Sequence, residues 1–300
     1  MRLLSAAEDA VFFATEHDVQ GCTAAPMATC KSVVDPAIVR GAGHGGNGAG
    51  VTGGAGGAGG SPTTAERLAP RALTVFGDRF FVADKTYDMV VGCPKSGCTT
   101  ASIGVVHDPD ADFSGGLFVD ALAVVWGDKS GIGTAPLPSA GQHLHGDVFS
   151  DARVRDVTRI EVSIIGGRDQ FVYRGSDGVF ATSLWRGDTP EQIQQGSVAR
   201  DFAADAKSIY VATGAAVVRV DRVTRARSTF AELPAGEVAR IVADDRGVFV
   251  STAGSGRASI FRVGDGRVDR IVSSTSVGAI SLSEKWVYYA GDGAVRRVAR

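Results

Sequence analysis

A run of aromatic and β-branched residues recurs seven times along the chain, and this repeat constrains the fold more than any other feature. The copies are centred on Phe12, Phe81, Val125, Val172, Tyr210, Phe249 and Tyr288. An acidic residue precedes each centre by three to five positions, and successive centres are 69, 44, 47, 38, 39 and 39 residues apart. Self-similarity at such a period is typical of repeat architectures, in which each unit buries its apolar face against its neighbours.

The sixth unit, residues 238–273, divides into four short β-rich runs. They are predicted as strands at residues 239–242, 248–251, 259–263 and 268–272, and Gly, Asp and Ser occupy the turns between them. Four strands in a period near 39 residues predict an all-β fold, a β-propeller of seven four-stranded blades. Six blades remain the alternative if the third or fourth unit is divided differently.

The last unit is expected to be incomplete. Its strands are predicted at residues 279–282, 286–289 and 294–298, after which the chain stops. Residues 2–5 are needed as the first strand of the first unit, so they do not supply the fourth strand of the last one.

The four cysteines form two local pairs, Cys22 with Cys30 and Cys93 with Cys98. When the units are aligned, Cys22 and Cys93 occupy the end of the third strand, and each partner opens the fourth. We therefore expect two disulfides, Cys22–Cys30 and Cys93–Cys98, each within one blade. The spacing within each pair is longer than the two residues typical of structural zinc sites, although free thiols and a metal remain alternatives.

Disulfides indicate an oxidising, extracytoplasmic compartment: the periplasm, the outer surface or the medium. The first ten residues, however, contain Glu8 and Asp9 where a signal peptide would have its apolar segment. One hypothesis explains both this and the incomplete last unit: the chain is an amino-terminally shortened form of a longer exported protein, whose lost part carried the signal and the closing strand. The alternative is a complete chain with a three-stranded last blade.

Residues 41–60 form a separate compositional region, with 12 glycines in 20 positions. Such a stretch does not bury enough apolar surface to offset the entropy of ordering it. We therefore divide the chain into a first blade at residues 1–40, a flexible glycine-rich linker at 41–67, and the remaining blades at 68–300, which form one domain with the first.

The formal net charge of −2 gives no general attraction to nucleic acid, and no apolar run reaches the roughly 20 residues of a membrane-spanning helix. Residues 219–300 hold 13 Arg and 1 Lys against 9 acidic residues, but the signs are interleaved, as on a mixed solvated surface. Among these arginines, Arg219, Arg262 and Arg297 recur on the third strands, where we expect them to be solvated or paired between blades.

The segment GCPKSGC at residues 92–98, followed by blades such as IVADDRGVFVSTAGSGRASIFRV at 241–263, resembles a diffuse group of secreted or lipid-anchored bacterial β-propeller-repeat proteins. A Cys-Pro-x-x-Gly-Cys hairpin and Gly-rich linkers are common in that group. Five of the seven units here lack the hairpin. The paired Gly-His and Trp-Asp signature of WD repeats is also absent, so the resemblance implies an architecture and little about function.

Two loop segments contain weak candidates for metal ligands. Asp108, Asp110 and Asp112 alternate as Ca²⁺ ligands do, but the glycine and glutamate required by an EF-hand loop are missing. His143 and His145 would share one face of a strand, and no third ligand is apparent. A solvated Asp/Pro turn and a polar inter-blade loop are the favoured interpretations. We assign no metal site, no catalytic residue and no cofactor.

The sequence favours a non-enzymatic binding or scaffold β-propeller on the extracytoplasmic side of a bacterial envelope. We expect a monomer that uses loops on one face of the ring to hold a protein or carbohydrate ligand, because recognition concentrates on loops carried by a rigid scaffold. The alternative is a propeller enzyme, a lyase or hydrolase, with its site at the mouth of the central channel. That alternative predicts titratable side chains converging on the axis from several blades.

Overall fold

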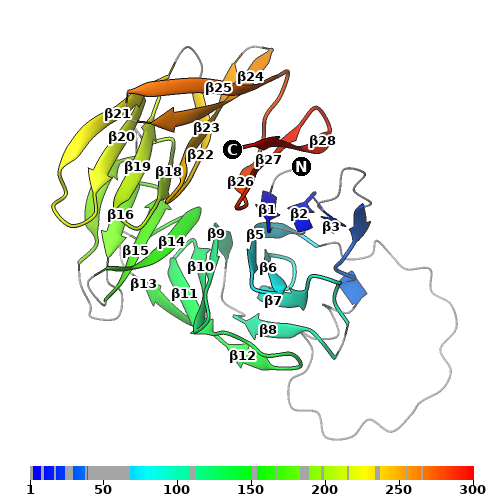
Figure 1. Ribbon diagram of the computed structural model, residues 1–300. Coiled ribbons are helices and arrows are strands. Elements are labelled where there is room, and N and C mark those ends of the chain that lie inside the picture. Colours follow the sequence, from blue (N-terminus) through cyan, green and yellow to red (C-terminus); the bar gives the residue numbers. More distant parts are fainter. Residues whose placement is uncertain are drawn as a thin grey trace, which may run out of the picture.

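The computed structural model has seven β-sheets arranged as the blades of a ring, so the prediction of a seven-bladed propeller is confirmed (Figure 1). The structure describes residues 3–7, 10–16, 18–23, 30–37, 39, 68–99, 101–108, 112–150, 154–165, 168–182, 189–196, 199–214, 216–233, 237–254, 256–264 and 266–300. The proposed linker at 41–67 lies outside these residues. In the described part of the chain, no helix is long and apolar enough to cross a membrane.

The first three blades carry the features that depart from a regular repeat. Blade 1 comprises β1 (Leu3–Ala6), β2 (Ala10–Ala14), β3 (Val19–Thr23) and β4 (Cys30–Ser32). Blade 2 comprises β5 (Pro70–Phe76), β6 (Arg79–Asp84), β7 (Met89–Pro94) and β8 (Gly104–His107). Blade 3 comprises β9 (Phe113–Val119), β10 (Ala123–Asp128), β11 (Gly131–Pro136) and β13 (Asp147–Ser150).

The last four blades complete the ring. Blade 4 comprises β14 (Arg159–Ile165), β15 (Arg168–Gly175), β16 (Gly178–Thr182) and β17 (Glu191–Gln195). Blade 5 comprises β18 (Asp201–Ala204), β19 (Ser208–Thr213), β20 (Ala216–Asp221) and β21 (Arg227–Glu232). Blade 6 comprises β22 (Glu237–Asp244), β23 (Gly247–Gly254), β24 (Arg257–Gly264) and β25 (Arg267–Ser274), and blade 7 comprises β26 (Ile280–Leu282), β27 (Trp286–Gly291) and β28 (Ala294–Ala299). The expected three-stranded last blade is therefore confirmed.

The recurring apolar runs form the second strand of every blade, where they are buried. Side chains of a strand alternate between its two faces, and in a propeller both faces meet a neighbouring blade. Phe80 of β6 packs with Phe12 of blade 1, whereas Phe81 packs with Val124 and Trp126 of blade 3. This alternation explains why the runs are continuously apolar. β1 also contacts β26, which closes the ring.

One strand departs from the repeat. β12 (His143–His145) follows β11 of blade 3 in the sequence, yet it pairs in parallel with β8 and becomes the fifth strand of blade 2. This segment is therefore a short strand and not the inter-blade loop expected from the sequence. Gly133 and Gly146 lie against the Trp126 indole; a Cβ at Gly133 would be 1.9 Å from Trp126 Cε2, so the close packing requires glycine there.

Both predicted disulfides are present in the structure. Cys22 and Cys30 are register partners on β3 and β4, with Cα atoms 4.2 Å apart. Cys93 lies on β7, but Cys98 lies in the loop before β8, so the expectation that it opens the fourth strand is wrong. The Cys98 amide instead donates to the carbonyl of Val33, 3.0 Å away, which joins the blade 2 hairpin to the chain that follows blade 1.

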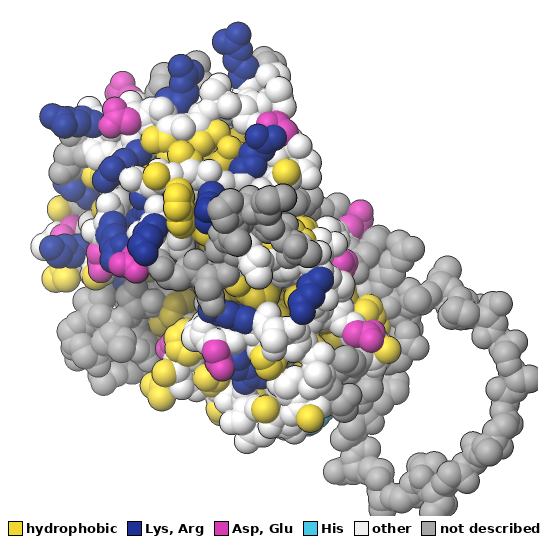
Figure 2. Space-filling view, turned by 45° about the vertical axis from the view of Figure 1, so that its right-hand side comes forward, with side chains coloured by type: hydrophobic (Ala, Val, Ile, Leu, Met, Phe, Trp, Pro, Cys, Tyr) yellow, Lys and Arg dark blue, Asp and Glu magenta, His cyan; other side chains and the backbone are white. Residues whose placement is uncertain are grey.

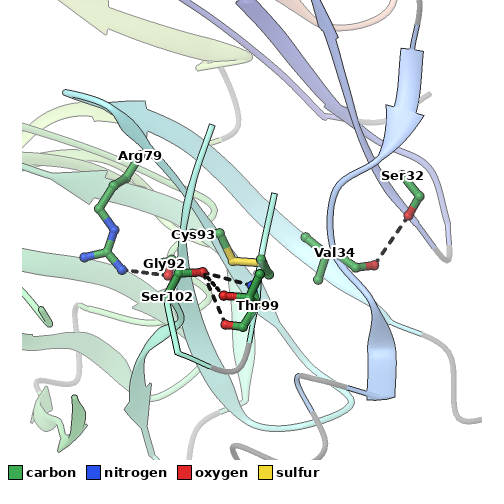
Figure 3. Close-up of a disulfide and its surroundings, with 8 residues drawn as sticks. Ser32, Val34, Arg79, Gly92, Cys93, Thr99 and Ser102 are labelled. Atoms are coloured by element: carbon green, nitrogen blue, oxygen red, sulfur yellow. Dashed lines mark hydrogen bonds between the residues drawn. A yellow bond between two sulfur atoms is a disulfide. The ribbon is translucent and has the colours of Figure 1, made fainter. Parts of the chain in front are cut away.

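Hydrogen bonds flank the hairpin that is bridged by Cys93 and Cys98 (Figure 3). Arg79 donates to the carbonyl of Gly92 at 2.7 Å and to that of Pro138 at 2.6 Å. Thr99 and Ser102 are joined by a 2.8 Å bond between their hydroxyls. These bonds use backbone carbonyls and local hydroxyls, so they serve the hairpin's conformation.

Candidate functional site

A cavity of about 490 Å³ opens on the ring axis, near the residues where most of the first strands begin. Its walls come from β1, β5, β9, β14, β22 and β26, which are first strands of their blades, and from the end of β15. It is lined by Leu3, Leu4, Arg71, Ala72, Leu73, Ser114, Gly115, Gly116, Leu117, Thr158, Arg159, Arg174, Arg240, Val242, Ala279 and Ile280. Its volume lies within the range usual for small-ligand sites.

The cavity contains four arginines, and none of its described lining residues is Asp or Glu. Arg71 comes from blade 2, Arg159 and Arg174 from blade 4, and Arg240 from blade 6. Arg159 and Arg174 are register partners on β14 and β15, an arrangement that like charges disfavour. We refer to this site as the arginine-lined cavity.

Arg159 is the arginine whose charge is balanced. Its guanidinium donates to Asp201 Oδ2 at 2.9 Å, to Glu161 Oε1 at 2.8 Å and to the carbonyl of Ile241 at 2.8 Å. Although burial acts to lower the pKa of Arg159, the carboxylates of Asp201 and Glu161 raise it above its ordinary value. This network ties blades 4, 5 and 6 together beside the channel.

The two carboxylates of this network, Asp201 and Glu161, accept hydrogen bonds from different backbone amides. Asp201 is 1% exposed and also accepts from the amide of Ile241 at 3.0 Å. Glu161 accepts from the amide of Ala204 at 2.6 Å, and burial raises its pKa despite the nearby Arg159. Arg240 lies 3.8 Å from Asp201 Oδ1, a weaker contact.

Arg71 and Arg174 form no ion pair with another described residue, in contrast to Arg159. They leave the cavity with uncompensated positive charge. Guanidinium groups present several N–H donors in a planar fork that matches carboxylate, sulfate and phosphate groups. The arrangement can therefore bind an anionic group.

Two adjacent glycines of the cavity wall lie beside Arg159. Gly115 and Gly116 have φ values of 139° and 60°, which favour glycine. A Cβ on Gly116 would lie 3.0 Å from Arg159 Cα, so the missing side chain lets β9 approach β14 closely. Ser114 next to them donates to the carbonyl of Val157 at 2.8 Å, which fixes this approach.

A second arginine-rich cavity, of about 520 Å³, lies between blades 5 and 6, and we call it the blade 5–6 seam. It is lined by turns at the ends of first strands, so it opens on the opposite face of the ring. Its charged residues are Arg219, Arg246, Arg262, Arg267, Asp205, Asp244, Asp245 and Asp269. Figure 2 shows basic side chains interspersed with acidic and hydrophobic ones over the upper part of the face in view.

A third cavity, of about 600 Å³, lies between blades 7 and 1. Phe13, Gln20, Val277 and Asp292 are among its lining residues. Bonds from the hydroxyls of Ser274 and Thr275 lower the pKa of Asp292 to about 2. Those bonds already occupy the carboxylate, which serves to join the loop before β26 to the turn after β27.

The aspartates singled out in the sequence do not come together. Asp112 binds Lys85 and Lys129, both at 2.5 Å, and the hydrogen bonds from these lysines lower its pKa. Asp108 is buried and its amide donates to the carbonyl of Asp88. Asp110 lies outside the described residues.

The two histidines singled out in the sequence, His143 and His145, lie on β12 and are exposed. The structure places His107 beside His145, with 6.1 Å between their ring centres. In the described part of the chain, no three His, Cys, Asp or Glu side chains gather closely enough to hold a metal ion.

Sequence reasoning located the channel mouth as the place to look for a site but missed its arginines. Arg71, Arg159 and Arg240 belong to the first strands of blades 2, 4 and 6, nine to thirteen residues before the centres of the second strands. Aligning the first strands of the units would have placed arginine on the inner strand of alternate blades. Of the three arginines that did draw notice, Arg219 and Arg297 stack on Phe230 and Trp286 of their own blades, and Arg262 lines the blade 5–6 seam.

No protein-family model and no curated protein matches the sequence. The fold is similar to a chain of the mitotic checkpoint complex, at 12% identity and a TM-score of 0.65 over 100% of this chain and 89% of that one. It is also similar to the WD40 β-propeller domain of Doa1, at 11% identity and a TM-score of 0.65 over 99% and 90%.

A third similar structure is the extracellular domain of a putative one-component system from B. thetaiotaomicron. It is 12% identical with a TM-score of 0.64, over 99% of this chain and 40% of that one. At these identities the likeness shows the fold alone: the chain is a seven-bladed β-propeller with WD40-like structural neighbours.

Proposed function

We propose that this protein is a non-enzymatic binding β-propeller of the extracytoplasmic side of a bacterial envelope, and that it holds an anionic ligand in the arginine-lined cavity. The observation that carries the proposal is the presence of four arginines in a cavity whose described lining includes no acidic side chain. Ligands bearing carboxylate or sulfate groups fit this chemistry, because such groups accept paired N–H donors from arginine.

Two observations support the compartment. Disulfides persist in oxidising surroundings, and the chain has two of them. One structure of similar fold is an extracellular domain. Fractionation of the source cells, with thiol labelling of the protein before and after reduction, tests this part. Recovery from the cytoplasm with four free thiols would contradict it.

Binding is tested by calorimetry with citrate and inorganic sulfate as probes, on the wild type and on two double variants. R71A/R174A removes the arginines without an ion pair to the described residues, and we expect the affinity for citrate to fall at least tenfold. R262A/R267A removes two arginines from the blade 5–6 seam as the matched control, and we expect its affinity to stay within twofold of the wild type.

Three outcomes would contradict the proposal: no binding of either anion by the wild type at millimolar concentration, no loss in R71A/R174A, or an equal loss in both double variants. Chemical conversion of a bound anion by the wild type would support the enzyme alternative instead. Circular dichroism of both variants confirms that the ring is intact.

A further inference from the structure

The lining of the arginine-lined cavity changes from basic to apolar around the ring. From blade 4, the lining includes Thr158, Arg159 and Arg174, and we call this part the basic wall. From blades 7 and 1, the described lining includes only apolar residues, and we call this part the apolar wall. It consists of Leu3, Leu4, Ala279 and Ile280.

The two walls lie across the ring axis from each other. Contacts between neighbouring blades place the seven blades in sequence order, and β1 of blade 1 contacts β26 of blade 7 (Figure 1). Blades 1 and 7 are each three blades away from blade 4, one in either direction around the ring. Their junction is therefore the part of the ring opposite blade 4, and the basic wall faces the apolar wall.

Blades 2 and 6 lie between these walls, each two blades away from blade 4, and each contributes residues of both kinds. In β5, Arg71 is followed two positions later by Leu73, and both line the cavity. In β22, Arg240 is followed two positions later by Val242, and both line it as well. The change from basic to apolar lining is therefore similar along the two sides of the ring.

The apolar wall is accessible, and the cavity is larger than an inorganic anion requires. Leu3 and Ala279 are half-buried, so part of their apolar surface remains in contact with water. The volume of about 490 Å³ corresponds to roughly 16 water molecules at about 30 Å³ each. An inorganic anion at the basic wall would displace few of these waters and would leave the apolar wall hydrated. A ligand that also covers the apolar wall gains the free energy of removing that surface from water.

We propose that the ligand of the arginine-lined cavity is an amphiphilic organic anion, with a carboxylate or sulfate group beside Arg174 and a short apolar body against Leu3 and Ala279. This inference rests on the proposed function, to which it adds the class of ligand. The guanidinium supplies paired N–H donors to the anionic group, and the leucine and alanine side chains supply an apolar contact.

The test compares two pairs of anions with the same charge and different chain lengths: acetate with hexanoate, and methyl sulfate with hexyl sulfate. Calorimetry on the whole chain measures each long-chain anion directly and each short-chain anion by competition. We expect the longer member of at least one pair to bind at least tenfold more tightly, because burying methylene groups is favourable. Its binding should also show a more negative change in heat capacity, the mark of buried apolar surface. The pair with the larger difference identifies the anionic group.

Variants of the two walls separate the roles of charge and apolar contact. L3N and A279N each place an amide on the apolar wall, and each should lower the ratio of long-chain to short-chain affinity at least threefold. R174A should lower both affinities by a similar factor. L282N is the matched control, because Leu282 is also half-buried but is outside the described lining, and its ratio should stay within twofold of the wild type.

Equal affinities within both pairs would overturn this inference while leaving anion binding by the cavity intact. A ratio that is unchanged in both L3N and A279N, or that falls equally in L282N, would also overturn it. Absence of binding by all four anions and by citrate and inorganic sulfate would overturn the proposed function as well. Circular dichroism identifies any variant that fails to fold, and either L3N or A279N alone is sufficient for the comparison.

Discussion

The arginine-lined cavity and the blade 5–6 seam each contain four arginines, yet they differ in what surrounds those arginines. The seam has four aspartates among its lining residues, whereas the described lining of the cavity has no acidic residue. The two volumes are nearly equal, at about 490 and 520 Å³. The number of arginines therefore does not identify an anion site, and the placement of counter-charges does.

At the seam, the charges are used within the fold. Arg246 pairs with Glu284 at 3.0 Å, and Arg300 forms two hydrogen bonds to Asp244. Burial opposes ionisation of Asp244, but these bonds hold its pKa below the ordinary value. Arg219 lies over the ring of Phe230. At the axis, by contrast, both carboxylates bonded to Arg159 lie behind the cavity wall, and Arg71 and Arg174 face the cavity itself.

The largest expected effect comes from removing the acid behind the cavity. In D201A, the guanidinium of Arg159 loses a 2.9 Å bond and the amide of Ile241 loses its acceptor. Arg159 keeps its pair with Glu161, but a hydrogen bond between charged groups is lost and a buried amide is left without its acceptor, so we expect a loss of about 2–3 kcal/mol in the free energy of unfolding. Urea denaturation measures it.

D269A, at the seam, is the control for that measurement, since Asp269 is exposed and forms no ion pair with another described residue. Its unfolding free energy should change by less than about 0.5 kcal/mol. Equal losses in the two variants would show that the axial network has no special role in stability.

The regular parts of this fold are predictable from sequence because packing between blades repeats. Each second strand is buried on both faces, so Phe80 and Phe81 are both apolar and the run is visible in every unit. Turn aspartates repeat for a similar reason: Asp205 accepts from the amides of Lys207 and Ser208 at 2.8 and 2.7 Å. Both features recur in every blade, so a search for repeats in the sequence detects them.

The arginine-lined cavity and the pairing of β12 with β8 depend on features that only some blades have. Arg71 and Arg240 lie on first strands whose counterparts in blades 1 and 7 are apolar, so they do not belong to a motif shared by all blades. The segment of β12 has only three residues, and its pairing with β8 depends on a partner about 38 positions earlier. Periodicity within one strand contains no information about such a distant partner.

A smaller effect concerns the pH dependence of anion binding in the cavity. Burial raises the pKa of Glu161, so this carboxyl takes up a proton at a higher pH than an exposed glutamate. Protonation removes a negative charge from behind the cavity wall. The affinity for sulfate, whose own charge is constant over this range, should therefore rise as the pH falls.

The expected rise is about three- to tenfold, the effect of one unit charge acting through a medium of intermediate dielectric constant. The E161Q variant carries no titratable group at this position, and its affinity should be independent of pH over the same range. Calorimetry at several pH values checks both. A wild-type affinity that falls on acidification would contradict the assignment of the site.

A still smaller effect is expected from altering the seam. If counter-charges are what exclude anions there, then D245N/D269N should create weak binding of sulfate at the seam. We expect the affinity of the seam for sulfate to be about two- to threefold higher than in the wild type, because two screened surface charges contribute little. Nuclear magnetic resonance shifts on blades 5 and 6 during sulfate titration report this gain, and shifts confined to the axial residues would refute it.

The smallest effect is expected from shortening the glycine-rich tract. Residues 41–60 lie outside the described residues, and neither arginine-rich cavity has a described lining residue between positions 5 and 70. Replacing the tract with a few glycines shortens a loop whose closure entropy grows only with the logarithm of its length. The free energy of unfolding should therefore change by less than about 1 kcal/mol, in the stabilising direction, and citrate affinity should not change. A large loss of stability would show that the tract is part of the fold, and a loss of citrate binding alone would show that it contributes to the arginine-lined cavity.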